Sequence, residues 1–197
     1  MNVGGTKSLA EEAVRCGVKR FIFLSSIQAV AEKSADGDSV NTKTSAAPQG
    51  AYGRYKPEAE QLLRRFSMES RMEVVIIRPP LVYGPGVKAN YRNLFQLVDK
   101  GIPLPLDALD SNRRSFVGVS NLIDLILLCL ENPAAANQTF HVSDDDDIST
   151  AKLLQRMGKA LGKPVRNLPI PKTVLKTGLR MIGKGEWVEK LFGDLLS

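Results

Sequence analysis

The stretch VKRFIFLSS, residues Val18–Ser26, indicates the fold class most directly. Its apolar run is short and ends at two serines, Ser25 and Ser26, which is typical of a strand buried on both faces. Residues Asn2–Gly17 precede it and predict a helix, because their apolar residues recur at helical spacing. Gly17 is suited to follow the last turn, since glycine adopts a left-handed conformation without strain.

The same order of helix and strand continues along the chain. A polar loop, Glu32–Gly50, is longer than most loops of compact domains, which favours a functional role. AYGRYKPEAEQLLRRF, Ala51–Phe66, then predicts a helix, and MEVVIIRPPLVYGPG, Met72–Gly86, a second buried strand that Pro79-Pro80 ends. Alternating helices and buried strands predict an α/β fold with a parallel sheet, helices on its faces, and a cleft at the carboxyl ends of the strands.

The pattern changes after residue 90. Short strand-like segments, RRSFVGV and QTFHVSD, alternate with a strongly apolar helix, NLIDLILLCLEN, and with a helix in STAKLLQRMGKALG that Ser149 is suited to cap. PIPKTVLKTGLRMIGK and EWVEKLFGDLL predict two more helices. We therefore expect residues 1–90 to form the later part of a dinucleotide-binding domain. Residues 91–197 are expected to form mainly a small α/β substrate-binding lobe, with some segments returning to the first domain.

Composition argues against several classes of protein. The 197 residues carry a net charge of +6, but the basic residues are scattered and not interleaved with aromatic ones, so nucleic acid is not an expected partner. Two cysteines and one histidine argue against a metal site, and both thiols are expected to be buried in a reducing compartment. No signal peptide opens the chain, and the longest apolar run, Leu125–Leu130, is far too short to span a bilayer, which predicts a cytoplasmic protein.

Tyr52 and Lys56 stand four residues apart at the start of a predicted helix and would share one face of it. A nearby ammonium favours the phenolate, so such a pair can take a proton from an alcohol while a cofactor accepts the hydride. Ser25 and Ser26 are placed to hold the alcohol oxygen. The alternative is that both are surface residues, and Pro57 favours it because proline disfavours the helical conformation of the residue before it.

Five segments in this order, NVGGT, FIFLSS, YGRYK, RPPLVYGPG and the polar loop between the second and third, resemble the extended short-chain dehydrogenase/reductase superfamily. Within it the chain resembles the NAD-dependent epimerase/dehydratase family that acts on nucleotide sugars, most of all the UDP-glucose 4-epimerase group. The resemblance implies a Rossmann-like, doubly wound parallel sheet, NAD as cofactor (NADP being possible), and a UDP-sugar or related nucleotide sugar as substrate. A homodimer is possible, and binding to a membrane surface is not expected.

The resemblance also implies roles for individual residues. Tyr52 is the acid/base, Lys56 binds the nicotinamide ribose, and Ser26, with Ser25 beside it, bonds the reacting oxygen. The other implied residues bind ligands: Arg78, Pro79 and Pro80 beside the nicotinamide, and Asn93, Leu94, Arg114 and Tyr83 at the substrate. Whether Arg113 or Arg114 points inward stays open, as does a purely structural ion pair for Arg78. No metal ligand is implied.

One departure from the family pattern is large. The family has a Gly-rich G-x-x-G-x-x-G turn for the cofactor pyrophosphate, and the sequence holds none. We therefore expect the chain to lack the first βαβαβ half of the fold, to expose one apolar sheet edge, and to bind NAD poorly alone.

Three functions stay open: a nucleotide-sugar 4-epimerase, an NAD(P)-dependent 4-keto-sugar nucleotide reductase, and a non-catalytic dinucleotide sensor. A 4,6-dehydratase is disfavoured, because such an enzyme would have a Thr or Ser with Asp-Glu at the strand end, and SSIQAVAEKS lacks that arrangement. A basic C-terminal stretch that could lie on anionic lipid is better explained as a helical hairpin over the lobe.

Overall fold

The computed structural model describes residues 2–30, 51–86, 90–181 and 183, with the backbone alone at positions 2, 51–54 and 90. The predicted helix in EWVEKLFGDLL and the polar loop before Ala51 lie outside these residues. The elements in chain order are α1 (Asn2–Arg15), β1 (Arg20–Leu24), η1 (Ile27–Ala29), α2 (Ala51–Glu69), β2 (Glu73–Arg78), β3 (Leu81–Tyr83), α3 (Asn90–Asp99), η2 (Asp107–Leu109), β4 (Phe116–Gly118), α4 (Val119–Glu131), η3 (Pro133–Ala135), β5 (Thr139–His141), α5 (Thr150–Ala160) and α6 (Lys172–Met181).

A parallel three-stranded sheet in the order β1-β2-β5 forms one end of the molecule. Its central strand β2 pairs with β1 from Arg20 opposite Glu73 to Leu24 opposite Ile77. β5 lies parallel on its other side, with Arg78 opposite His141. The carboxyl ends of β1, β2 and β5 therefore meet at the same edge, as the alternation of helices and strands predicts.

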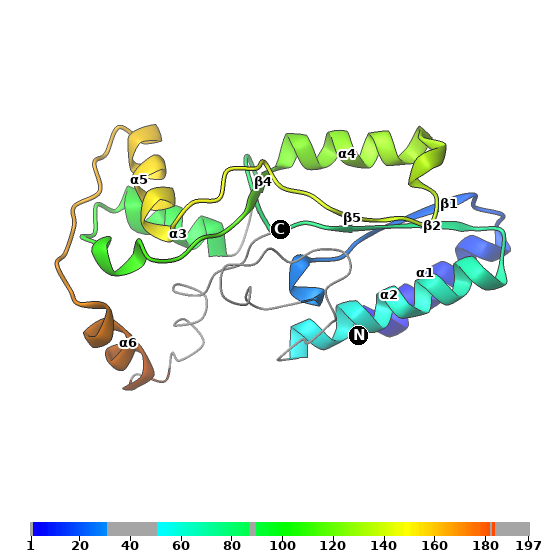
Figure 1. Ribbon diagram of the computed structural model, residues 1–197, viewed down its shortest axis with the longest axis horizontal. Coiled ribbons are helices and arrows are strands. Elements are labelled where there is room, and N and C mark those ends of the chain that lie inside the picture. The colour runs from blue at the N-terminus through cyan, green and yellow to red at the C-terminus, as the bar shows by residue number, and fades with distance from the viewer. Residues whose placement is uncertain (1, 31–50, 87–89, 182, 184–197) are drawn as a thin grey trace.

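The side chains of β2 divide between two cores because successive residues of a strand point to opposite faces. Val74 and Ile76 join a cluster with Ala10 of α1 and Leu63 of α2. The intervening residues Val75 and Ile77 join a cluster on the α4 side. Figure 1 shows the result, with α1 and α2 covering one face of the sheet and α4 the other.

The other end of the molecule is a smaller lobe. β3 and β4 form a parallel pair there, in which Leu81 is opposite Phe116. α3, η2 and α5 pack around a third core that includes Phe116 and Leu154, and Figure 1 shows these elements at the end away from α1 and α2. β5 pairs with β2, and α4 packs against the same sheet, although both elements follow residue 91. The exact division of the chain into two domains stays a prediction.

Two predicted helix ends are confirmed, and one predicted burial is wrong. Gly17 has φ +70, and hydrogen bonds from its N–H to Val14 O and from Val18 N to Ala13 O close the last turn of α1. Ser149 caps α5, accepting a bond from Lys152 N through its hydroxyl. Of the two free thiols only that of Cys129 is buried. Cys16 follows the last residue of α1 and is exposed, and its thiol lies 3.5 Å from Glu12 Oε1.

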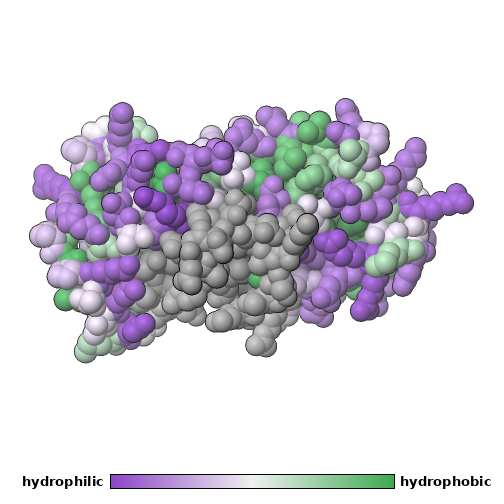
Figure 2. Space-filling model, viewed as in Figure 1, coloured by the Kyte–Doolittle hydropathy of each residue, from purple (hydrophilic) through white to green (hydrophobic). Residues whose placement is uncertain are grey.

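Apolar surface is exposed on the outer side of α4. Ile123, Leu127 and Leu130 are each about half exposed, and hydrophobic atoms gather over this helix in Figure 2. β1 pairs only with β2 within the described part of the chain, and Leu24 at its end is 42% exposed. The predicted open sheet edge is therefore present among these residues.

Candidate functional site

The end of β1 is fixed by backbone hydrogen bonds to the end of β2. Ser25 N donates to Ile77 O at 2.8 Å, and Ile27 N donates to Pro79 O at 3.1 Å. Ser26 lies between them and caps η1, where its Oγ accepts a bond from Gln28 N at 3.2 Å. The two serines thus lie at the carboxyl end of β1, beside Pro79, which is predicted to lie next to the nicotinamide.

Lys56 reaches this strand end from α2. Its Nζ donates to Leu24 O at 2.7 Å and lies 4.7 Å from the centre of the Phe23 ring. Burial lowers the pKa of Lys56, and the negative charge of Glu60 acts in the opposite direction. The structure therefore places the Lys56 ammonium at the end of β1, directly before the two serines.

Tyr52 lies in the first turn of α2, and its side chain is outside the described atoms. The pairing of its phenol with Lys56 therefore stays a prediction. α2 continues through Pro57 without ending. A proline removes one backbone donor from a helix. The turns that follow are nevertheless packed, because Ala59 and Leu63 are buried and Leu63 joins the core shared with β2.

Arg78 lies in a buried ion pair. Its Nε donates to Glu60 Oε1 at 3.0 Å, one terminal nitrogen donates to Oε2 at 2.5 Å, and the other lies 3.4 Å from His141 Nε2. Ser25 Oγ also donates to Glu60 Oε1, at 2.5 Å. Glu60 is absent from the residues that the sequence singles out, yet its position could have indicated it, since it lies one helical turn after Lys56 and one before the buried Leu63.

Tyr83, the predicted substrate ligand, is bonded to a carboxylate. Its hydroxyl donates to Asp144 Oδ2 at 2.7 Å, and Gly118 N donates to the same oxygen at 2.9 Å. Asn121 donates to the other oxygen at 2.7 Å. The bond to Asp144 raises the pKa of Tyr83, so this phenol stays protonated and is unsuited to act as a base.

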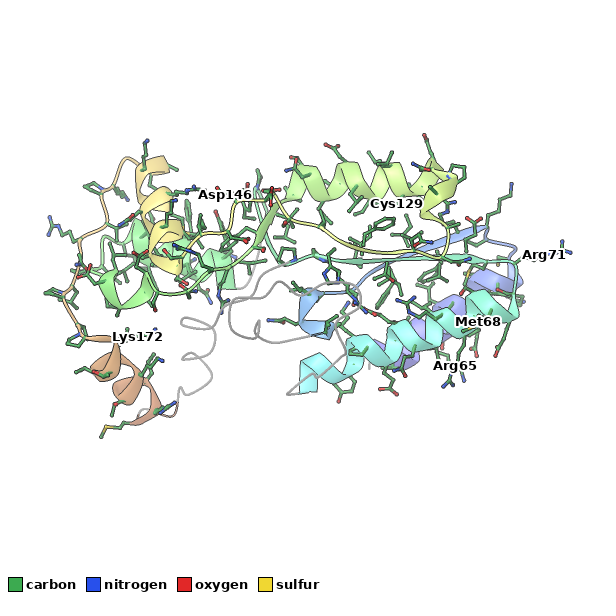
Figure 3. The ribbon with its side chains drawn as sticks, viewed as in Figure 1. Arg65, Met68, Arg71, Cys129, Asp146 and Lys172 are labelled. Atoms are coloured by element: carbon green, nitrogen blue, oxygen red, sulfur yellow. The ribbon has the colours of Figure 1, made fainter. Side chains whose placement is uncertain are left out.

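An aromatic cavity of about 200 Å³ opens next to Tyr83. The Tyr83 and Tyr91 rings stack with centroids 6.3 Å apart, and an ion pair of 2.5 Å between Asp146 and Arg156 lies at its border. Figure 3 shows Asp146 near the lobe, far from Cys129 at the sheet end of the molecule. The complete lining is Tyr83, Tyr91, Phe95, Phe116, Asp144, Asp146, Ile148, Leu153, Arg156, Met157 and Ala160. Lys56 and the two serines are not part of it.

The two predicted residues of α3 have different surroundings. Asn93 is exposed, whereas Leu94 is half-buried and packs against the core of the lobe. The Leu94 side chain is therefore used in packing, which leaves its backbone as the part that could meet a phosphate.

Arg114 is half-buried and Arg113 is exposed. Which of the two faces a substrate stays a prediction. The backbone of Arg114 pairs with Ile148 through two hydrogen bonds of 3.1 Å. Beside it, Asn112 and Thr150 bond each other twice at 3.0 Å and are both buried. Arg114 thus lies on the segment before β4, which is hydrogen-bonded to the residues at the start of α5.

Neither a candidate metal site nor a candidate membrane-spanning helix is found within residues 2–30, 51–86 and 90–181. No group of three or more metal-ligating side chains occurs there. No helix in this part of the chain combines the length and the apolar character needed to cross a membrane.

Known epimerases are similar to this chain in amino-acid sequence. A UDP-glucose 4-epimerase of Vibrio cholerae is 47% identical over 195 residues, which are 99% of this chain and 60% of that protein. An N-acetyl-alpha-D-glucosaminyl-diphospho-ditrans,octacis-undecaprenol 4-epimerase of Escherichia coli O157:H7 is 27% identical over 87% of this chain and 51% of that protein. The chain therefore spans between half and about three fifths of the length of these relatives.

Solved structures share the fold. A UDP-glucose 4-epimerase of Thermus thermophilus in complex with NAD superposes with a TM-score of 0.73 at 22% identity, over 86% of this chain and 57% of that one. A UDP-glucuronic acid 4-epimerase of Bacillus cereus in complex with NAD gives 0.75 at 22% identity, over 85% and 54%. These similarities confirm the predicted Rossmann-like α/β fold.

The family model described as "NAD dependent epimerase/dehydratase family" matches residues 1–143. This range contains α1, the strand-end serines, Lys56 and the Glu60–Arg78 pair. The chain belongs to the NAD-dependent epimerase/dehydratase family.

Proposed function

We propose that the protein is an NAD-dependent nucleotide-sugar 4-epimerase that acts on UDP-sugars by transient oxidation at C4. The observation that carries this proposal is the position of the Lys56 ammonium at the carboxyl end of β1, directly before Ser25 and Ser26. The name of the 47% identical relative from Vibrio cholerae supports the same reaction and substrate class.

The residues present fit the nicotinamide half of the cofactor. When bound, NAD accepts a hydride from the sugar carbon and returns it. The Lys56 ammonium has three N–H donors, of which one bonds Leu24 O, so further donors remain for ribose hydroxyls. Two nitrogens of Arg78 donate to Glu60, so we assign Arg78 to holding the end of β2 in place. The backbone of Pro79 and Pro80 is then the part of this segment that would lie beside the nicotinamide.

The hydrogen bonds of the two serines favour Ser26 as the residue that contacts the substrate. Ser25 uses its own proton in the bond to Glu60. Ser26 accepts a bond from Gln28 N, and this bond does not use the proton of the Ser26 hydroxyl. Ser26 can therefore donate to the C4 oxygen while Tyr52 takes the C4 hydroxyl proton.

After oxidation, the 4-keto sugar would turn over and present its other face before Tyr52 returns the proton. This turnover requires the nucleotide to be held while the sugar moves. Arg114 is the proposed ligand of the diphosphate, because a guanidinium fork suits two phosphate oxygens. The α3 backbone at Asn93 and Leu94, and the ring of Tyr83 at the border of the cavity, are the other proposed contacts.

The test is to incubate the protein with UDP-glucose and NAD and to follow UDP-galactose by NMR. Wild type should interconvert the two sugars, and Ser26→Ala should lower kcat about 10²-fold, as loss of a donor to a reacting oxygen does. Ser8→Ala, at an exposed position of α1, is the control and should leave kcat unchanged. Because the chain is expected to bind NAD poorly alone, NAD binding is titrated first. Absence of any inversion at C4 with UDP-sugars at an NAD concentration that saturates the protein would refute the proposal.

The same assay separates the alternatives. A 4-keto-sugar nucleotide reductase, using NAD or NADP, would consume one reduced cofactor for each sugar released, whereas an epimerase consumes none. A non-catalytic sensor would bind the dinucleotide with no turnover. A homodimer also remains a proposal, for which light scattering would report the mass.

A further inference from the structure

Glu60 connects three elements at the proposed centre. It projects from α2 and is 3% exposed. Its carboxylate accepts the Ser25 hydroxyl at the end of β1 and two nitrogens of Arg78 at the end of β2. Burying a carboxylate is costly unless it is paired and fully hydrogen-bonded, and this one is both. Such a group is suited to fix the relative positions of the elements that it joins.

The same helix carries Lys56, one turn before Glu60. Lys56 bonds the carbonyl of Leu24, and Glu60 bonds the side chain of the next residue, Ser25. α2 therefore holds two consecutive residues at the end of β1. The residue that follows them is Ser26, whose hydroxyl is the proposed donor to the substrate.

We propose that Glu60 is a positioning residue of this centre, which fixes Ser26 relative to Lys56 by holding Ser25 and Arg78. The proposal rests on the proposed function for its catalytic meaning, because Ser26 and Lys56 are assigned through it. No contact with substrate or cofactor is assigned to Glu60, because both of its carboxylate oxygens are bonded to protein side chains.

Glu60 also supplies a negative charge close to the Lys56 ammonium. Burial lowers the pKa of Lys56, and the charge of Glu60 opposes this. Among the described residues, the other charged or titratable groups facing Glu60 are Arg78 of β2 and, beyond it, His141 of β5. α1 contributes apolar side chains to the core that it shares with α2. Neutralising Glu60 would therefore leave two cations, Arg78 and Lys56, with less compensation.

The experiment compares Glu60→Gln with Glu58→Gln, a control that removes the same charge from an exposed position two residues away. The full chain is labelled with ¹³C and ¹⁵N at its lysines, and the Lys56 side-chain signal is assigned by its loss in Lys56→Arg. Its titration midpoint should move down in Glu60→Gln and stay near the wild-type value in Glu58→Gln. An unchanged midpoint in folded Glu60→Gln would overturn the proposal, because a carboxylate that α2 holds close to the Lys56 ammonium must raise the Lys56 midpoint.

Ser25→Ala provides the second arm, which keeps the Glu60–Arg78 pair and so does not depend on the folding of Glu60→Gln. Amide hydrogen exchange at Ile27 and Ala29 should become faster than in wild type, and kcat should fall roughly 10²-fold with KM nearly unchanged. Wild-type exchange together with wild-type kcat in Ser25→Ala would overturn the proposal. If wild type itself shows no epimerisation, the proposed function fails, while the Lys56 midpoint and the exchange rates still decide the role of Glu60.

Discussion

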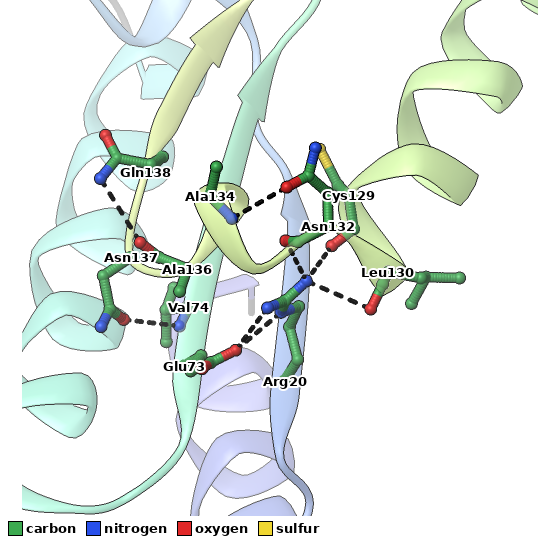
Figure 4. A network of polar contacts seen from close by, with 10 residues as sticks. All are labelled: Arg20, Glu73, Val74, Cys129, Leu130, Asn132, Ala134, Ala136, Asn137 and Gln138. Atoms are coloured by element: carbon green, nitrogen blue, oxygen red, sulfur yellow. Dashed lines mark hydrogen bonds and ion pairs between the residues drawn. The ribbon is translucent and has the colours of Figure 1, made fainter.

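Arg20 joins the first sheet to the end of α4, and its removal provides a test of how this face is held. One terminal nitrogen of Arg20 donates to the carbonyl oxygens of Cys129 at 2.5 Å, Leu130 at 3.1 Å and Asn132 at 2.9 Å. The other two nitrogens bond Glu73 at 2.8 and 2.7 Å. Figure 4 shows that the guanidinium lies between the β2 carboxylate and the last turn of α4.

The magnitude follows from burial. The Arg20 side chain is 11% exposed, so Arg20→Met leaves helix-terminal carbonyls without their donor and Glu73 without its cation. Glu73 is 39% exposed and can be rehydrated, which places the cost below the roughly 3–5 kcal/mol typical of a fully buried broken pair. We expect a loss of about 2–4 kcal/mol in the free energy of unfolding, or roughly 4–16 °C in Tm for a chain of this size.

The assay is urea unfolding followed by circular dichroism, with Arg15→Met as the matched control. Arg15 also pairs with a glutamate, Glu12, but the Arg15 side chain is 76% exposed and water replaces the lost contact. The control should be indistinguishable from wild type. Arg20→Lys should recover only part of the loss, because an ammonium lacks the planar fork that reaches both groups. Equal stability of Arg20→Met and Arg15→Met would refute the reasoning.

Four more substitutions have outcomes that follow from the structure. Gly158→Ala in α5 should lower Tm although alanine is the better helix former, because the added Cβ would lie 2.6 Å from the backbone oxygen of Lys163. Gly178→Ala in α6 should raise the free energy of unfolding by about 0.5–1 kcal/mol, because the added Cβ meets nothing within 4 Å. Thermal melts compare the two variants. Burial acts to raise the pKa of Asp144, but its three hydrogen bonds outweigh this and hold it below the ordinary value. The folded state thus binds fewer protons there, so the stability that Asp144 adds is complete above about pH 4 and is lost as pH falls through the lowered pKa, a slope that Asp144→Asn should flatten in acid titrations. Leu127→Gln, on the exposed side of α4, should change the free energy of unfolding by less than about 0.5 kcal/mol in urea, and a larger loss would mean that this side chain is buried in solution.

The sequence predicts the parallel sheet well, because its signal is local and strong. VKRFIFL and EVVIIR are apolar on both faces, and such strands require helices on both sides. Gly17 and Ser149 mark helix ends through properties of single residues, which do not depend on the rest of the fold. Both predictions are confirmed for these reasons.

The polar networks could not be predicted, because they join residues far apart in sequence. Glu60 and Arg78 are 18 residues apart, and Tyr83 and Asp144 are 61 apart. Each partner alone resembles a surface residue or a ligand of substrate. Only the folded structure shows that Arg78 is bonded to a carboxylate of α2 and that Tyr83 is bonded to Asp144.

The measurement that tests the central claim most directly is the titration of the Tyr52 phenol, observed by NMR with ¹³C-labelled tyrosine in wild type and in Lys56→Met. If the ammonium of Lys56 prepares this phenol to take a proton, the Tyr52 midpoint in wild type must lie below that in Lys56→Met. Equal midpoints in two folded proteins would contradict the account, since Lys56 would then have no influence on the proposed base.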